Sequence, residues 1–168
     1  MKKSKQILKQ RMYSIVLYSL SPMQKGIQSY HATIEYSLKY GKTPEYQQWA
    51  KNDKTVIILD GGSSNQVGVD HYSGSSYTGS LDVALILLEE NNIKFMPFFE
   101  PDCNNTMTAI SFLVDEKTWD KKKYPLPKNL NELEQSSLEF WEKPEIIKLF
   151  GKEAAFLRPF LNNYHLAR

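Results

Sequence analysis

The residues best suited to chemistry gather in one short stretch of the sequence, 100–108. It holds two acids, Glu100 and Asp102, on either side of a proline, followed by amides and hydroxyls that include Asn105 and Thr108. A carboxylate in such a place can orient or deprotonate a water molecule, and a hydroxyl or amide beside it can stabilise an oxyanion. The same composition also suits an ordinary polar turn between two strands.

A second group of polar side chains follows one edge of a predicted helix over 21–41. Ser21 suits its N-cap, Pro22 its first turn and Gly41 its end. The polar edge consists of residues at helical spacing: Gln24, Gln28, His31 and Glu35. We expect this edge to line a cleft, although a normal surface flank with a half-buried histidine has the same pattern.

The apolar residues of the same helix predict which side meets the core. Ile27, Tyr30, Ile34 and Leu38 recur at helical spacing on one face, so we expect this face to pack inward. The polar edge would then lie where the helix surface passes from core to solvent. There His31 could form an acid–base pair with an acid of the 100–108 stretch.

The elements that must position these groups alternate between strands and helices. Apolar runs predict strands over 13–20, 55–59, 94–100 and 108–114, and helical spacing predicts helices over 21–41, 44–53 and 81–92. This order favours an α/β fold with a four-stranded mixed sheet and helices on both faces. We assign a basic tail to 1–11, the α/β domain to 12–116 and a helical C-terminal extension to 117–168.

Composition excludes several kinds of site. A single cysteine, Cys103, rules out an intrachain disulfide and cysteine-based metal sites. The three histidines are far apart in sequence, so we expect no metal and no organic cofactor. A net charge of +2 gives no argument for nucleic acid, and no apolar run approaches the ~20 residues that span a bilayer. We therefore expect a cytoplasmic protein without a membrane anchor.

Two short motifs suggest a minor alternative. His31-Ala32-Thr33 and His71-Tyr72-Ser73 each have the His-x-Thr/Ser form that two-histidine phosphoesterases use twice. In those enzymes the motifs lie on facing strands. Here the first falls in a predicted helix and the second in a loop rich in glycine and serine.

The order of elements, together with two local motifs, resembles the type II peptidyl-tRNA hydrolase family. The first helix carries Gln28-Ser29-Tyr30-His31-Ala32, which matches the Gln-x-x-His-Ala motif of that family. An acidic turn, Glu100-Pro101-Asp102, ends the third strand, and Thr108-Ala109 opens the fourth. The resemblance covers roughly 13–114 and implies a four-stranded mixed sheet with helices on both sides. Variants with this combination look like those encoded by bacteriophages.

This resemblance implies hydrolysis of the ester that joins a peptide or amino acid to tRNA. The implied catalytic residues are Gln28, His31, Glu100, Asp102 and Thr108. Lys25, Lys94 and Asn105 are the candidate substrate-binding residues. The family's lysine at the start of the helix is not reproduced in register, since Gln24-Lys25-Gly26 only lies nearby.

That departure leaves a second interpretation open. A catalytically inactive binding module of the same fold would recognise tRNA, another RNA or a host protein. The aromatic C-terminal extension, 117–168, is a candidate surface for a protein partner if it does not pack on the sheet. The oligomeric state, with a homodimer among the options, is left open by the sequence.

Overall fold

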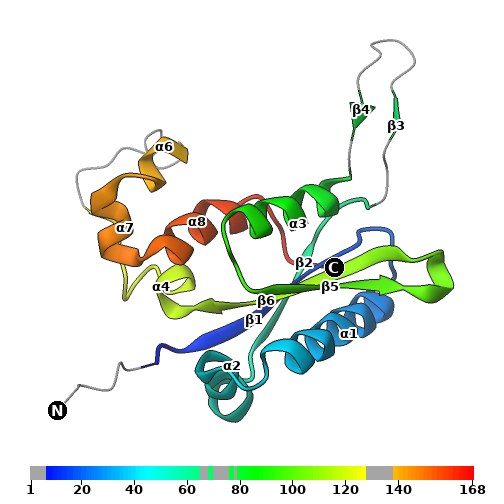
Figure 1. The fold of residues 1–168 in the computed structure, drawn as a ribbon, viewed down its shortest axis with the longest axis horizontal. Helices are drawn as coiled ribbons and strands as arrows, with labels where there is room; N and C mark the ends of the chain where they lie inside the picture. Colours follow the sequence, from blue (N-terminus) through cyan, green and yellow to red (C-terminus); the bar gives the residue numbers. More distant parts are fainter. Residues whose placement is uncertain (1–6, 65–67, 70–75, 78, 128–137) are drawn as a thin grey trace.

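The structure has the predicted α/β fold, and its main sheet has the predicted four strands. The computed structural model describes residues 7–64, 68–69, 76–77, 79–127 and 138–168 (Figure 1). The sheet has the order β2-β1-β6-β5 and consists of β1 (Gln10–Val16), β2 (Val56–Asp60), β5 (Phe95–Glu100) and β6 (Thr106–Asp115). β1 and β2 are parallel, whereas β6 runs antiparallel to both β1 and β5. The predicted α/β class and mixed sheet are therefore confirmed. A separate short ribbon pairs β3 (Gly68–Val69) with β4 (Ser76–Tyr77).

Helices cover both faces of this sheet (Figure 1). One face carries α1 (Pro22–Tyr40), α2 (Pro44–Gln48) and the π-helical turn η1 (Trp49–Asp53). The other carries α3 (Ser80–Glu90) and α8 (Lys152–Leu161). Around α8 pack α4 (Glu116–Trp119), α6 (Leu138–Trp141) and α7 (Pro144–Phe150).

The central strand, β1, sends alternate side chains into two different cores. Tyr13 and Ile15 join a cluster with α3 and with Leu157 and Phe160 of α8. Met12 lies on the opposite face, in a cluster with α1 and η1. Because α8 supplies side chains to the main core, the C-terminal helices form one packed unit with the sheet, as expected of a segment this aromatic.

The element boundaries refine the sequence assignment at both ends. β1 begins at Gln10, two residues before the predicted domain start, and Gln10 pairs with Asp115 of β6. The guanidinium of Arg11 lies 3.6 Å from the ring centre of Trp119, so this basic residue is held on the domain. Part of the predicted helical extension, 128–137, lies outside the described residues, and α6 follows directly after it.

The face of α1 that packs on the sheet is the opposite of the one predicted. The expected core residues Ile27, Tyr30, Ile34 and Leu38 are exposed, with 38–76% of their surface accessible. The buried side chains of α1 are Lys25, Gln28, Ser29, Ala32, Thr33 and Tyr36. At about 100° per residue these two sets lie on opposite sides of the helix. The prediction of an inward apolar face is therefore wrong.

Small polar residues of the sheet explain this orientation. The strands beneath α1 present Ser14 and Ser111, whose hydroxyls are 2.7 Å apart, and Thr33 of α1 lies 3.4 Å from the Ser111 hydroxyl. Thr33 also donates to the Ser29 carbonyl within the helix. Such small side chains let the helix approach closely, and a buried hydroxyl needs a hydrogen-bond partner. Large apolar side chains would not fit in this narrow space and would remove the contact of Thr33 with the Ser111 hydroxyl.

The last residues of the chain lie against the outer edge of β2. Leu166 pairs with Leu59 in an antiparallel bridge, the Asp60 amide donates to the His165 carbonyl, and the Ala167 amide donates to the Ile58 carbonyl. The free edge of β2 is therefore covered by the chain itself.

Arg158 of α8 joins the C-terminal helices to the segment that follows β6. This side chain is 3% exposed, and its guanidinium lies 3.9 Å from the ring centre of Phe150. It donates to the carbonyl of Lys117 at 2.8 and 2.5 Å and to that of Tyr124 at 2.6 Å. One side chain thus joins α8, α7 and the segment after β6.

We expect Arg158→Met to lower the free energy of unfolding by about 2–4 kcal/mol, because it leaves two buried carbonyls without their donor. Urea unfolding followed by circular dichroism measures this change. The matched control is Lys148→Met on the exposed surface of α7, which should stay within about 0.5 kcal/mol of wild type. A loss below 1 kcal/mol for Arg158→Met would contradict the assigned role.

Candidate functional site

The candidate site lies at the edge of the sheet where β1, β2 and β5 end. These three strands run in the same direction, so their carboxyl ends and the N-terminus of α1 meet at one edge. Ligand sites of open α/β sheets occur at this edge. Asp60 ends β2 and Glu100 ends β5, and Thr108 lies near the start of the antiparallel β6.

Gln28 of α1 connects the two motifs that the sequence singled out. Its side-chain oxygen accepts a hydrogen bond from the Thr108 hydroxyl at 2.7 Å, and its side-chain nitrogen donates to Glu100 at 2.5 Å. Gln28 and Thr108 are 7% and 1% exposed, whereas Glu100 is partly accessible. The three side chains therefore form one chain of hydrogen bonds that leads from the interior to a carboxylate within reach of solvent.

A β-bulge turns Thr108 toward α1. Phe98 pairs with Ala109 and Phe99 pairs with Met107, so Thr108 is the extra residue of β6. Ala109 itself packs against Ala32 beneath α1. Without the extra residue, strand alternation would place the side chain before Ala109 on the other face of the sheet. Bulges re-aim single side chains in this way and are common next to active sites.

His31 lies one turn after Gln28 and stands against β5. Its ring centre is 4.7 Å from that of Phe98, in a tilted arrangement. Its Nδ1 is buried and has no hydrogen-bond partner among the described residues. A buried unpaired nitrogen is unfavourable, so this atom is suited to a proton or hydrogen bond supplied by a ligand or water.

The acidic turn after β5 is exposed and tightly folded. Pro101–Cys103 form a 3-10 turn, η2, and Asp102 and Asn105 are both exposed. Asn104 and Asn105 have φ values of 54° and 53°, a left-handed conformation that asparagine tolerates better than most residues. The turn thus extends Asp102 and Asn105 into solvent beside Glu100, and neither joins the hydrogen-bonded chain of Gln28.

The two candidate lysines lie at different places. Lys25 is buried, and its ammonium forms an ion pair of 2.6 Å with Asp60 and lies 3.4 Å from the Arg168 carbonyl. Lys94 precedes β5 and is therefore separated from Glu100 by the full length of that strand. The structure thus joins Gln28, Glu100 and Thr108 by hydrogen bonds. His31 lies one turn further along α1 against Phe98, and Lys25 lies on the β2 side of the same helix.

Asp60 is the residue of this edge that the sequence analysis missed. It pairs with Lys25 across 35 positions, and both are largely shielded from solvent. In the sequence, Asp60 could have been recognised as a candidate because it directly follows the apolar run that forms β2. A charge at the carboxyl end of such a strand lies at the edge that holds ligand sites.

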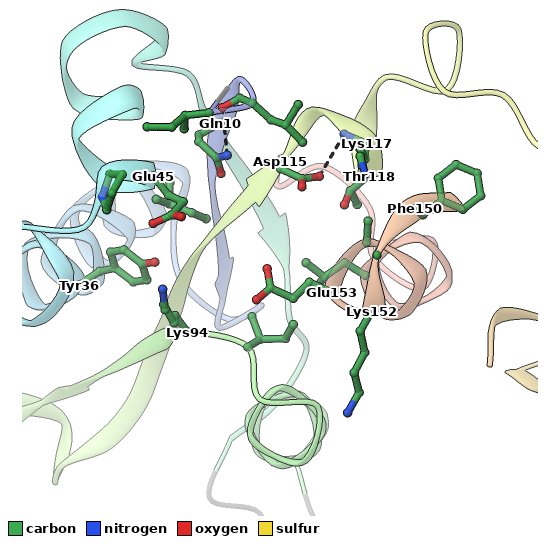
Figure 2. Close-up of a pocket in the computed structure, with 18 residues that line it drawn as sticks. Gln10, Tyr36, Glu45, Lys94, Asp115, Lys117, Thr118, Phe150, Lys152 and Glu153 are labelled. Carbon is green, nitrogen blue, oxygen red and sulfur yellow. Dashed lines mark hydrogen bonds between the residues drawn. The ribbon is translucent and has the colours of Figure 1, made fainter. Parts of the chain in front are cut away.

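A cleft lies at the opposite edge of the sheet (Figure 2). It has a volume of about 700 Å³, and its charged lining comprises Glu45, Lys94, Asp115, Lys117, Lys152 and Glu153. Burial raises the pKa of the Tyr36 hydroxyl, which points into it, and also raises the pKa of Asp115. Three acids and three lysines line the cleft, so its lining favours neither sign of ligand charge.

The comparisons with known proteins give no family. No model of a known protein family matches this chain, and no curated protein matches its sequence. Within the described residues, no cluster of three or more histidine, cysteine or acidic side chains is placed to hold a metal ion. No helix in that part of the chain is long and apolar enough to cross a bilayer. The second histidine of the phosphoesterase alternative, His71, lies outside the described residues.

The hydrogen bond from Thr108 can be tested by its effect on stability. Thr108→Val keeps the shape but leaves the Gln28 oxygen unpaired, so we expect a loss of about 1–3 kcal/mol in the free energy of unfolding. Thr118 is the matched control, because it is 3% exposed and its hydroxyl has no partner among the described residues. Thr118→Val should be neutral or stabilising in the same urea titration. Equal effects of the two substitutions would contradict the assignment.

The raised pKa of Asp115 predicts a pH-dependent stability. Its carboxylate caps α4 by accepting from the Lys117 amide at 3.0 Å, and burial opposes its ionisation. Because the pKa is higher in the folded state, the protonated form favours folding, and this contribution is lost as pH rises from about 3.9 through the folded pKa. Asp115→Asn keeps an acceptor without the charge.

The stability of Asp115→Asn relative to wild type should therefore increase between pH 3.5 and pH 7, measured by thermal unfolding in steps of pH. Asp120→Asn changes the net charge equally and is the control, since Asp120 accepts a single bond from the Lys123 amide at the surface. If the stability of Asp115→Asn relative to wild type decreased as the pH rises, the assignment would be contradicted.

Proposed function

We propose that this chain hydrolyses the ester bond that joins a peptide or a single amino acid to the end of tRNA. The observation that supports the proposal is the bonding of Gln28 to both Glu100 and Thr108. These residues are 72 and 80 positions from Gln28, and they belong to the two motifs on which the resemblance to type II peptidyl-tRNA hydrolases rests. Residues that serve one site are expected to meet in this way.

The arrangement can supply the groups that ester hydrolysis requires. Glu100 is held by Gln28 at one oxygen and is partly accessible, so it can receive a proton from an attacking water. The water oxygen bonds to the ester carbon, and the carbonyl oxygen becomes an oxyanion that amide and hydroxyl donors stabilise. Asn105 and the Gln28 amide are the candidate donors.

The second step breaks the bond between the ester carbon and the ribose oxygen of tRNA. The leaving oxygen takes a proton, and His31 is the candidate acid because it lies one turn after Gln28 on α1 and its Nδ1 has no partner among the described residues. The products are the free carboxylic acid and tRNA with a free hydroxyl. Asp102, exposed on the adjoining turn, is the second candidate base.

The binding of tRNA also requires positively charged side chains that contact its phosphates. Lys25 is held in its ion pair with Asp60, so it acts on this edge by fixing α1 to the end of β2. Lys94 is a candidate for phosphate contact only at the far edge of the sheet. We place the reaction in the cytoplasm, where aminoacylated tRNA is found.

A binding module without catalysis is the second candidate function. The same hydrogen bonds favour it, because the bond between Thr108 and Gln28 can stabilise the packing of α1 on the sheet without any role in catalysis. Such a module would recognise tRNA, another RNA or a host protein through this edge. Binding to RNA would weaken steeply with salt, because phosphate contacts release counterions.

The decisive experiment incubates the protein with N-blocked aminoacyl-tRNA and follows the release of free tRNA. Wild type should cleave the ester, and Glu100→Gln and His31→Ala should each lower kcat/KM by roughly a hundredfold or more. Glu89→Gln, an exposed carboxylate on α3, is the control and should retain wild-type activity.

A folded wild-type protein that leaves the ester intact would reject the hydrolase. Salt-dependent binding of the intact aminoacyl-tRNA would then support the RNA-binding module, and no binding at low salt would favour a protein partner.

A further inference from the structure

The outer surface of α1 carries an apolar stripe that the fold of one chain leaves uncovered. It consists of Met23, Ile27, Tyr30, Ile34 and Leu38, which are 77%, 46%, 63%, 38% and 76% exposed. At about 100° per residue the five side chains lie within an arc of about 80°. The stripe contains no charged residue, and α1 packs on the sheet through its opposite face.

The composition of the stripe is typical of an interface. Cores of protein interfaces are depleted in charged residues and enriched in aromatic residues and methionine. The successive spacings of four, three, four and four residues form a seam of the kind that packs helix against helix. α1 therefore has an amphipathic pattern whose apolar side is not covered by the described residues of this chain.

The order of residues in the stripe points to a second copy of this chain as the occupant. Met23 and Leu38 lie equally far from the point between Tyr30 and His31, and so do Ile27 and Ile34. An antiparallel copy of the same helix would therefore place Met23 on Leu38 and Ile27 on Ile34 at both ends. A twofold interface requires this kind of self-complementarity, and an unrelated partner does not.

We propose that the chain forms a twofold dimer through antiparallel packing of α1 on α1, centred between Tyr30 and His31. The two aromatic Tyr30 side chains meet near the axis, and Met23, Ile27, Ile34 and Leu38 fill the seam on either side. Rotation about the twofold axis places the two His31 rings on the same flank of the dimer. One helix pair buries less surface than the about 800 Å² per partner of a standard complex, so we expect the association to be weak and reversible.

Analytical ultracentrifugation from about 1 µM to about 500 µM tests the dimer, with folding of each variant checked by circular dichroism. Wild type should pass from monomer to dimer over this range. Ile27→Glu should raise the dissociation constant by a hundredfold or more, because twofold symmetry buries the added carboxylate twice. Ile86→Glu is a matched control, since Ile86 on α3 is 45% exposed, and it should dimerise as wild type does.

A charge exchange tests the antiparallel register. Ile34→Lys alone should also weaken association, but Ile27→Glu combined with Ile34→Lys should restore it, because each new carboxylate then faces an ammonium of the other copy. The restored dimer should weaken as salt increases. A wild type that stays monomeric at about 500 µM, an equal effect of Ile86→Glu and Ile27→Glu, or no rescue by the double variant would overturn the proposal.

Discussion

The close approach of α1 to the sheet is the constraint on which the rest of this structure depends. Ser14 and Ser111 present hydroxyls at the surface of the sheet, and Ala32 and Thr33 are the side chains that fit against them. The interior of the contact therefore has little room and needs hydrogen-bond donors and acceptors. These two demands, rather than hydrophobicity, set the rotation of α1 about its axis.

That rotation determines what the edge of the sheet can do. It directs Gln28 into the interior, where the bulge of β6 has brought Thr108, and it leaves the carboxylate of Glu100 between Gln28 and solvent. It also buries the stem and charge of Lys25, which is stable there because Asp60 at the end of β2 neutralises it. An unpaired ammonium in the same place would be strongly destabilising. The candidate site is thus formed by polar groups that also hold the layers together.

The sequence was sufficient for the order of strands and helices because their apolar runs and caps are strong local signals. Ser21 caps α1 with the reciprocal bonds of a capping box, and Gly41 ends it, both as expected. Glu100 ends β5 where the apolar run 94–100 predicted the end of a strand. These features depend on residues that are near each other in the sequence.

Other features depend on pairs of distant residues, which the pattern of one helix cannot show. The apolar face of α1 looked like the core face because the small hydroxyls of Ser14 and Ser111 leave no periodic signal in their strands. The bulge at Thr108 is a mismatch of register between two strands, and a single strand does not encode it. Asp60 was likewise visible only as the end of a strand until Lys25 was placed beside it.

The segment that runs along β2 has a consequence for the sheet as a whole. A strand edge with free amides is a template onto which another chain can add, and repeated addition produces fibrils. Here His165 and Ala167 occupy the backbone groups of β2, and Pro97 interrupts the outer row of donors on β5. Addition of another copy of this chain to the sheet is therefore hindered at both edges, and removal of residues 165–167 would uncover the edge of β2.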